Sequence, residues 1–547
     1  MTEVPDVWNP STLPTETAAL PKRARSTKSA WCLVAVLMVL GVAVEMRGFT
    51  RDLPYPDTDE PVFIQPAVHM ASTGDLDPHW FGHPGSTVIY PLALVFHFED
   101  VVVHGGPVFT SNADVARRFQ SSVGHFYLVG RLWVVVFAIG AIPLLFLLGR
   151  RVFGTTAGII AALWWVFLPL IVSYGRIVRT DSAGVFFTLL SLLLIVRIVE
   201  HATVRTNVFA GLAIGLAVSS RYFLVTLIPI LVLANLVDAH RQRRPQAIRG
   251  ILAGCGTALA CFLATTPYFL LDLRTAVHSI TLENTHLIGH DGFTPPGNFA
   301  WYAGTAIPGA ISWPLVGLAV IGVVLVLRRR NVEQLLLLAF VAFFVAAVSM
   351  GQLHWNRWVI PVLGIVLLLA ADAVVSAVAA VDRERTHKRL AAIGLIVAAL
   401  ILAAIPAEAV ISLDQRTSRP STRTLGRSWV DRNIPRNARI AEEVKTVPLQ
   451  HSGRVYFHRH ALAPGRTLDR YRSEGFRYLI TNESVRIAYQ GSAAGHPTEN
   501  AFYRDLARSG CLVARFRPND QRAGPSIDIW ALAVPAAADH RSCLLAR

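Results

Sequence analysis

The feature that most constrains this chain is a series of long apolar segments separated by short polar ones. Crossing the hydrocarbon core of a bilayer takes about 20 apolar residues in a helix, and most of these segments approach that length. Of the 547 residues, 53% are hydrophobic and only 16% are charged, which is unlike a soluble domain. We therefore predict a polytopic α-helical membrane protein. The predicted spans are 30–49, 130–149, 155–175, 182–198, 207–220, 222–238, 249–271, 304–327, 332–350, 358–380 and 390–412.

The basic residues predict how these spans are oriented, because cytoplasmic loops are rich in Lys and Arg. Segment 86–103 is also apolar, and counting it as a span reverses every later loop. Treated instead as a juxtamembrane helix, it leaves all the later basic clusters on the same side as the N-terminal one. We therefore expect a multi-pass inner or plasma membrane protein with a cytoplasmic N-terminus. The clusters lie at 22–28, 150–151, 241–244, 328–330 and 383–389.

The same clusters explain the formal charge of +15 without a nucleic-acid partner. Three regions follow: a disordered cytoplasmic tail (1–29), a transmembrane domain (30–412) with a long first external loop (50–129), and an extracytoplasmic α/β domain (413–547). Strand-like runs at 438–441, 478–481 and 527–530 support the last assignment. Cys511 and Cys543 both lie in that domain, as a disulfide or as two free thiols.

Ionisable residues gather on the side predicted to be external. Charged groups at membrane depth are costly and by default indicate a functional site. Taken singly, each group also fits a helix cap, a snorkelling anchor, a turn or an aromatic belt. Their position on one face favours a site. The residues are Asp59, Glu60, His83, Arg176, Arg179, Asp181, Arg221, His354 and Arg357.

Several short motifs occur in a characteristic order along the chain. They are Asp59-Glu60 after the first span, His83-Pro84 before the juxtamembrane helix, the segments 149–154 and 173–181, Arg357 to Pro361, and 433–441. Together they resemble the GT-C superfamily of polyprenyl-phosphate-sugar-dependent glycosyltransferases, in the branch of protein O-mannosyltransferases and lipid A aminoarabinose transferase. The chain departs from that pattern in three places. Gly85 replaces a frequent Pro, His83 stands where Lys can occur, and Trp358 stands where Tyr is usual.

The resemblance implies a GT-C-like fold and a transfer reaction on the extracytoplasmic face. A sugar would move with inversion from a polyprenyl-phosphate donor to an acceptor hydroxyl on a protein, lipid or polysaccharide. It implies Asp59 as the base that accepts the hydroxyl proton, with Glu60 orienting Asp59 or the acceptor. Repulsion between these adjacent acids predicts a raised pKa for one of them. Candidate ligands of the donor phosphate are His83, Arg221, His354 and Arg357, with Arg176, Arg179 and Asp181 in a supporting or substrate-orienting role.

No nucleotide-binding motif accompanies these residues, which agrees with a lipid-linked donor. No cofactor and no metal ligands are predicted. Asp57-Thr58-Asp59 resembles a metal-binding D-x-D motif, so a divalent cation stays open. Two other classes of function are also considered, a transporter or lipid flippase and a non-catalytic scaffold for the C-terminal domain. A transporter predicts two related halves with polar groups at mid-membrane, which the sequence does not display.

Overall fold

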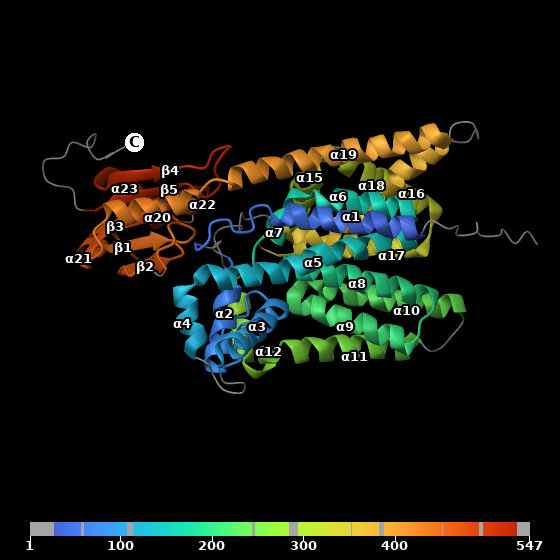
Figure 1. Ribbon diagram of the computed structural model, residues 1–547, viewed down its shortest axis with the longest axis horizontal. Helices are drawn as coiled ribbons and strands as arrows, with labels where there is room; N and C mark the ends of the chain where they lie inside the picture. The colour runs from blue at the N-terminus through green and yellow to red at the C-terminus, as the bar shows by residue number, and fades with distance from the viewer. Residues whose placement is uncertain are drawn as a thin grey trace, which may run out of the picture.

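The computed structural model describes residues 27–55, 59–106, 113–242, 247–283, 294–351, 353–381, 388–450, 452–491 and 496–532. Most of the N-terminal tail, Asp57, Thr58 and Cys543 therefore lie outside the described residues. The fold is mainly helical, with a bundle of long helices at one end of the molecule and a small sheet domain at the other (Figure 1).

The bundle helices run roughly along the longest axis of the molecule (Figure 1). Their shared core is apolar and includes Trp164 and Trp165, whereas Val39, Val136 and Ile401 are more than half exposed on its outer surface. An apolar outer surface is what lipid contact requires. The helices are α1 (Thr27–Met46), α5 (Val123–Val152), α6 (Thr155–Val166), α7 (Pro169–Gly175), α8 (Asp181–Glu200), α9 (Val204–Ser220), α10 (Leu227–Gln242), α11 (Ala247–Thr265), α16 (Trp313–Arg329), α17 (Val332–Ser349), α18 (Ile360–Val381) and α19 (Lys388–Thr417).

Among the described residues, nine helices are long and apolar enough to cross a membrane, or up to eleven if each of two bent pairs counts as one span. One of the nine is α3 (Ser86–His104), so eight others remain. These eight, the two bent pairs and the shorter helix α9 correspond to the eleven predicted segments. The protein is thus a multi-pass membrane protein.

Segment 304–327 is not the single straight span that the sequence predicted. The chain forms α14 (Pro295–Trp301), a π-helical turn (Tyr302–Ala306) and α15 (Ile307–Ile311), then turns by 116° into α16. Pro314 accounts for the break, because it has no N–H and its ring excludes a preceding helical turn. Ser312 completes the corner with a positive φ of 83°. A smaller bend of 62° separates α6 from α7 at Pro169.

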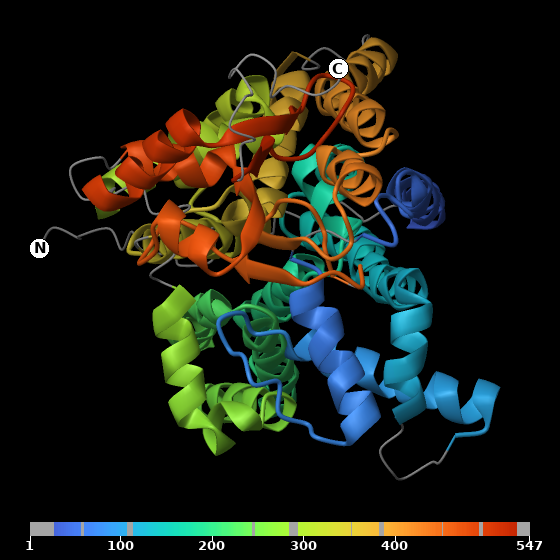
Figure 2. The ribbon, with the colours of Figure 1, turned by 90° about the vertical axis from the view of Figure 1, so that its left-hand side faces the viewer.

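Three helices between α1 and α5 lie together at one end of the bundle, and their position agrees with the prediction that α3 is a juxtamembrane helix. These are α2 (Pro61–Thr73), α3 and α4 (Ala113–Ser121) (Figure 1). Figure 2 looks along the bundle from that end and shows α2 crossing in front of it. The group has its own core, with Phe63, Leu92 and Phe96 buried. On the outer side of α3, Leu94 and Phe98 are 71% and 68% exposed.

The sheet domain follows α19 at the same end of the bundle (Figure 1). Its five strands are ordered β2-β1-β3-β5-β4, with β1 parallel to β2 and β3, and β5 antiparallel to β3 and β4. The three predicted strand segments are confirmed in β1, β3 and β5, and two further strands complete the sheet. The elements are α20 (Thr422–Asn433), β1 (Arg439–Glu443), β2 (Tyr456–Arg459), α21 (Leu468–Ser473), β3 (Phe476–Asn482), α22 (Glu483–Gly491), α23 (Pro497–Ser509), β4 (Cys511–Phe516) and β5 (Ile527–Ala531).

Candidate active site

Four charged side chains form a continuous ion-pair chain, here called the Asp59 cluster. Asp59 lies just before α2 and accepts a hydrogen bond from Nη1 of Arg179, which is buried between α7 and α8. Arg179 Nε donates to Asp181 Oδ2 at 3.1 Å. The other oxygen of Asp181 lies 2.5 Å from Nη2 of Arg221, directly after α9. Residues from three distant parts of the chain thus meet where helices begin or end.

The sequence predicted a raised pKa for one of the two adjacent acids, whereas the pKa of Asp59 is lowered. Burial favours the protonated acid, but the positive charges of Arg179, Lys445 and Arg357 outweigh it and hold the pKa well below its usual value. Asp59 is therefore an ionised carboxylate throughout the physiological range. Repulsion from Glu60 does not dominate because the two side chains bind different partners.

Glu60 is fully buried in a separate group, here called the Glu60 cluster. Its two oxygens accept from Nε and Nη2 of Arg131 in α5, at 2.8 and 2.7 Å, and Oε1 also accepts from the amide of Val178 at 3.0 Å. Nη1 of Arg131 donates to the carbonyls of Phe49 and Arg51. Such bidentate, charge-assisted pairing fixes the start of α2 against α5. Sequence reasoning missed Arg131, whose only signal is a lone Arg in an apolar helix.

His83 lies beside the Asp59 cluster, in the loop between α2 and α3. Its Nε2 is 3.4 Å from Oε1 of Glu283, the last residue of α13 (Leu273–Glu283). Burial lowers the pKa of His83; Glu283 opposes this, and the charges of Arg179, Arg221 and Arg357 add to it, giving a pKa of about 4. His83 is consequently neutral at neutral pH.

The segment before α18 brings His354 and Arg357 to the same end of the bundle. His354 is buried against Trp301, with ring centroids 4.2 Å apart. The Arg357 guanidinium lies 4.7 Å from the ring centroid of Trp355. Lys445, in the turn after β1, places Nζ 5.8 Å from that same centroid. The sheet domain therefore contributes a cation to the site, one that the sequence did not indicate.

Arg176 does not join the Asp59 cluster. Its Nη1 is 2.5 Å from Asp414 Oδ1 in α19, and its Nη2 donates to the carbonyl of Val44 at 2.6 Å. Glu45 lies further away, at 3.9 Å from Nε. These contacts connect α1, the end of α7 and α19, and they are spatially separate from the contacts of Arg179.

The arginines near Asp59 retain donors that no described protein atom accepts. These are Nη2 of Arg179, Nε of Arg221 and Nε of Arg357, all buried. A buried N–H without an acceptor costs free energy, so such groups favour an anionic ligand. By contrast, each guanidinium nitrogen of Arg131 already donates to a protein acceptor. The site thus combines one ionised carboxylate with guanidinium donors suited to an anion such as phosphate.

Comparison with known proteins shows which families and folds the chain resembles. Residues 119–268 match the family model described as dolichyl-phosphate-mannose-protein mannosyltransferase. ArnT from Cupriavidus metallidurans is similar in its apo state (16% identity, TM-score 0.53) and bound to undecaprenyl phosphate (15%, 0.54), with 94% of this chain and 100% of that chain covered in each case. The archaeal oligosaccharyltransferase AglB from Archaeoglobus fulgidus, in complex with an inhibitory peptide and a dolichol-phosphate, is 12% identical (TM-score 0.51), covering 94% of this chain and 76% of that one. No curated protein sequence matches the chain.

The fold is that of the GT-C membrane glycosyltransferases. Residues 119–268 in addition resemble the dolichyl-phosphate-mannose-protein mannosyltransferase family.

Proposed function

We propose that this chain transfers a sugar from a polyprenyl-phosphate donor to an acceptor hydroxyl, with inversion at the anomeric carbon. The observation that carries the proposal is the Asp59 cluster, an ionised carboxylate held among arginines with unused donors. The relatives add support, since ArnT was solved with undecaprenyl phosphate and AglB with dolichol-phosphate. Asp59 takes the proton of the attacking hydroxyl, and the arginines stabilise charge on the departing phosphate.

Phosphate binding has a second effect on the base. In the present arrangement Asp59 is a weak base, because Arg179 and its neighbours lower its pKa. A phosphate on the free donors of Arg179 and Arg221 brings negative charge close to Asp59, which raises the pKa of that carboxylate. Donor binding thus prepares Asp59 to accept a proton.

Glu60 has an indirect role in this proposal. Its contacts to Arg131 and to the Val178 amide hold the segment that carries Asp59 against the segment that carries Arg179. Glu60 therefore positions Asp59 and does not touch the acceptor. His83 and His354 extend the site around the donor, and Lys445 covers it from the sheet domain.

We place this site on the extracytoplasmic face of the inner or plasma membrane. The support is the distribution of basic residues, which puts the N-terminus in the cytoplasm. The juxtamembrane helices and the sheet domain share one end of the bundle (Figure 1), and Asp59 lies just before α2, the first of these helices. A lipid-linked donor in the outer leaflet has access to this end of the bundle, so no nucleotide-sugar donor is needed on that face.

Binding of undecaprenyl phosphate to the purified full-length chain tests the phosphate site. Arg221→Gln and Arg357→Gln should each weaken binding about tenfold or more, since each removes a charged donor. Arg205→Gln is the matched control, because Arg205 is an exposed residue near the opposite end of α9. Native mass spectrometry of the detergent-solubilised protein gives the bound fraction. Wild-type affinity in an Arg221→Gln/Arg357→Gln double variant would contradict the proposed site.

A further inference from the structure

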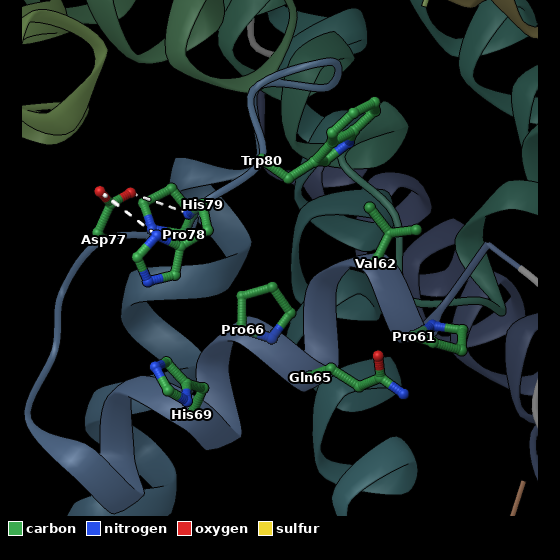
Figure 3. A pocket seen from close by; sticks show the side chains of 9 residues that line it. All are labelled: Pro61, Val62, Gln65, Pro66, His69, Asp77, Pro78, His79 and Trp80. Atoms are coloured by element: carbon green, nitrogen blue, oxygen red, sulfur yellow. Dashed lines mark hydrogen bonds and ion pairs between the residues drawn. The ribbon is translucent and has the colours of Figure 1, made fainter. Parts of the chain in front are cut away.

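A second group of chemically capable side chains lies on the outer side of the juxtamembrane helices. His69 is on α2, and Asp75 and His79 follow in the loop that leads to α3. Nε2 of His79 is 3.0 Å from Oδ2 of Asp75, and Nε2 of His69 is 3.8 Å from the same oxygen. One ligand atom from each residue lies within 4.8 Å of the other two. Figure 3 shows both histidines beside an open pocket of 410 Å³.

These distances fit tetrahedral zinc. Zinc binds His nitrogen and Asp oxygen at about 2.0–2.2 Å, so two ligand atoms at tetrahedral corners are about 3.3 Å apart. The two separations from the Asp75 oxygen, 3.0 and 3.8 Å, fall on either side of that value. Two imidazoles and one carboxylate are a common zinc ligand set, with water in the fourth position.

Hydrogen bonds and an ion pair around the group orient two of its three members, Asp75 and His79. Asp77 Oδ1 accepts from the amide of His79 at 2.9 Å, and Asp77 Oδ2 lies 3.6 Å from Nδ1 of the same ring. A carboxylate beside one ring nitrogen leaves the other nitrogen as the metal ligand, as in many zinc sites. Asp75 uses Oδ1 to accept from the Asp77 amide at 2.9 Å, which directs Oδ2 at the histidines. His79 is held at a positive φ of 53°, an uncommon conformation for a residue other than glycine.

We propose that His69, Asp75 and His79 bind one zinc ion, with Asp77 as the orienting partner of His79. The ion joins α2 to the loop that follows it. That loop continues through Trp80 to His83, and α2 begins next to Asp59, so the ion fixes the spacing between two parts of the candidate active site. This consequence rests on the proposed function, whereas zinc binding itself does not.

The test measures metal binding and needs no transfer activity. The full-length chain in detergent is stripped with a chelator, equilibrated with micromolar zinc sulfate and analysed by elemental mass spectrometry. The wild type should retain about one zinc per chain. His69→Ala/His79→Ala should retain none, and Asp77→Asn should bind about 10- to 100-fold more weakly. His125→Ala is the matched control, because His125 is an exposed histidine near the start of α5 that is paired with Glu99.

Cobalt substitution adds a spectroscopic readout. Co²⁺ in the wild type should give the intense visible bands of tetrahedral coordination, and these bands should be absent from the double variant but present in His125→Ala. Equal zinc content in the wild type and the double variant overturns the proposal. Zinc that is lost equally in His125→Ala also overturns it, because the ion is then held non-specifically by surface histidines.

Discussion

The two acids of the Asp59-Glu60 pair belong to two ion-pair clusters of opposite character. In the Glu60 cluster, each guanidinium nitrogen of Arg131 donates to a carboxylate or carbonyl oxygen. In the Asp59 cluster, Arg179 and Arg221 are equally buried but keep donors that no described protein atom accepts. Both clusters are made of the same residue types at the same end of the bundle. We interpret the completely paired Glu60 cluster as a structural contact and the unused donors of the Asp59 cluster as capacity for a ligand.

The largest expected effect is on stability and concerns the Glu60 cluster. Arg131→Gln leaves Glu60 buried without its cation, which typically costs about 3–5 kcal/mol. The unfolding temperature of the detergent-solubilised protein should fall clearly. Glu60→Gln/Arg131→Gln should recover part of the loss, because it removes both charges. An Arg131→Gln variant as stable as the wild type would show that the Glu60 cluster does not hold the fold.

The next largest effect is on catalysis and concerns the Asp59 cluster. Arg179→Gln removes the cation that most strongly lowers the pKa of Asp59, so that pKa should rise. Because Asp59 acts as the ionised base, the acidic limb of the rate–pH profile should move to higher pH. Loss of a charge that stabilises the transition state should also lower the transfer rate by about 10²–10³. Arg176→Gln is the control for the pH shift, because Arg176 contacts Asp414 instead. The prediction fails if the acidic limb does not move in Arg179→Gln.

A smaller effect is expected at Lys445, at the edge of the Asp59 cluster. Lys445 is half-buried, and its charge also lowers the pKa of Asp59. Lys445→Gln should reduce transfer about two- to fivefold, in line with the modest free energy of solvent-screened pairs. Lys445→Arg should retain activity. Steady-state rates at several salt concentrations distinguish an electrostatic contribution from a steric one, since only the former decreases with salt.

The smallest effect concerns the pH dependence contributed by His83. Its pKa is lowered to about 4, so the ring stays neutral from about pH 6 to pH 8. His83→Asn should therefore leave the shape of the kcat/KM profile unchanged in that window, even if the rate falls. An inflection near pH 6.5 in the wild type that vanishes in His83→Asn would mean that the ring titrates there.

Much of the bundle could be predicted from the length of its apolar segments, because the thickness of the hydrocarbon core imposes that length. The break in segment 304–327 was missed because a count of apolar residues ignores Pro314. Arg176 and Arg179 were expected together, since three residues make about one helical turn. However, α7 ends at Gly175, so the helical spacing does not apply and the two side chains diverge. Arg131 lies 71 residues beyond its partner Glu60 (131 − 60), and Lys445 lies 386 residues beyond Asp59, whose pKa it lowers (445 − 59). Only the folded chain reveals such pairings.

The most direct test of the central claim is Asp59→Asn, expressed in cells that lack the native gene. The membrane level and the unfolding temperature of the variant are first compared with those of the wild type. Lipids and glycans of the cells are then analysed by mass spectrometry. We expect a folded protein, an accumulated polyprenyl-phosphate sugar and the loss of one glycan. Full restoration of that glycan by Asp59→Asn at wild-type protein levels would contradict the assignment of Asp59 as the base.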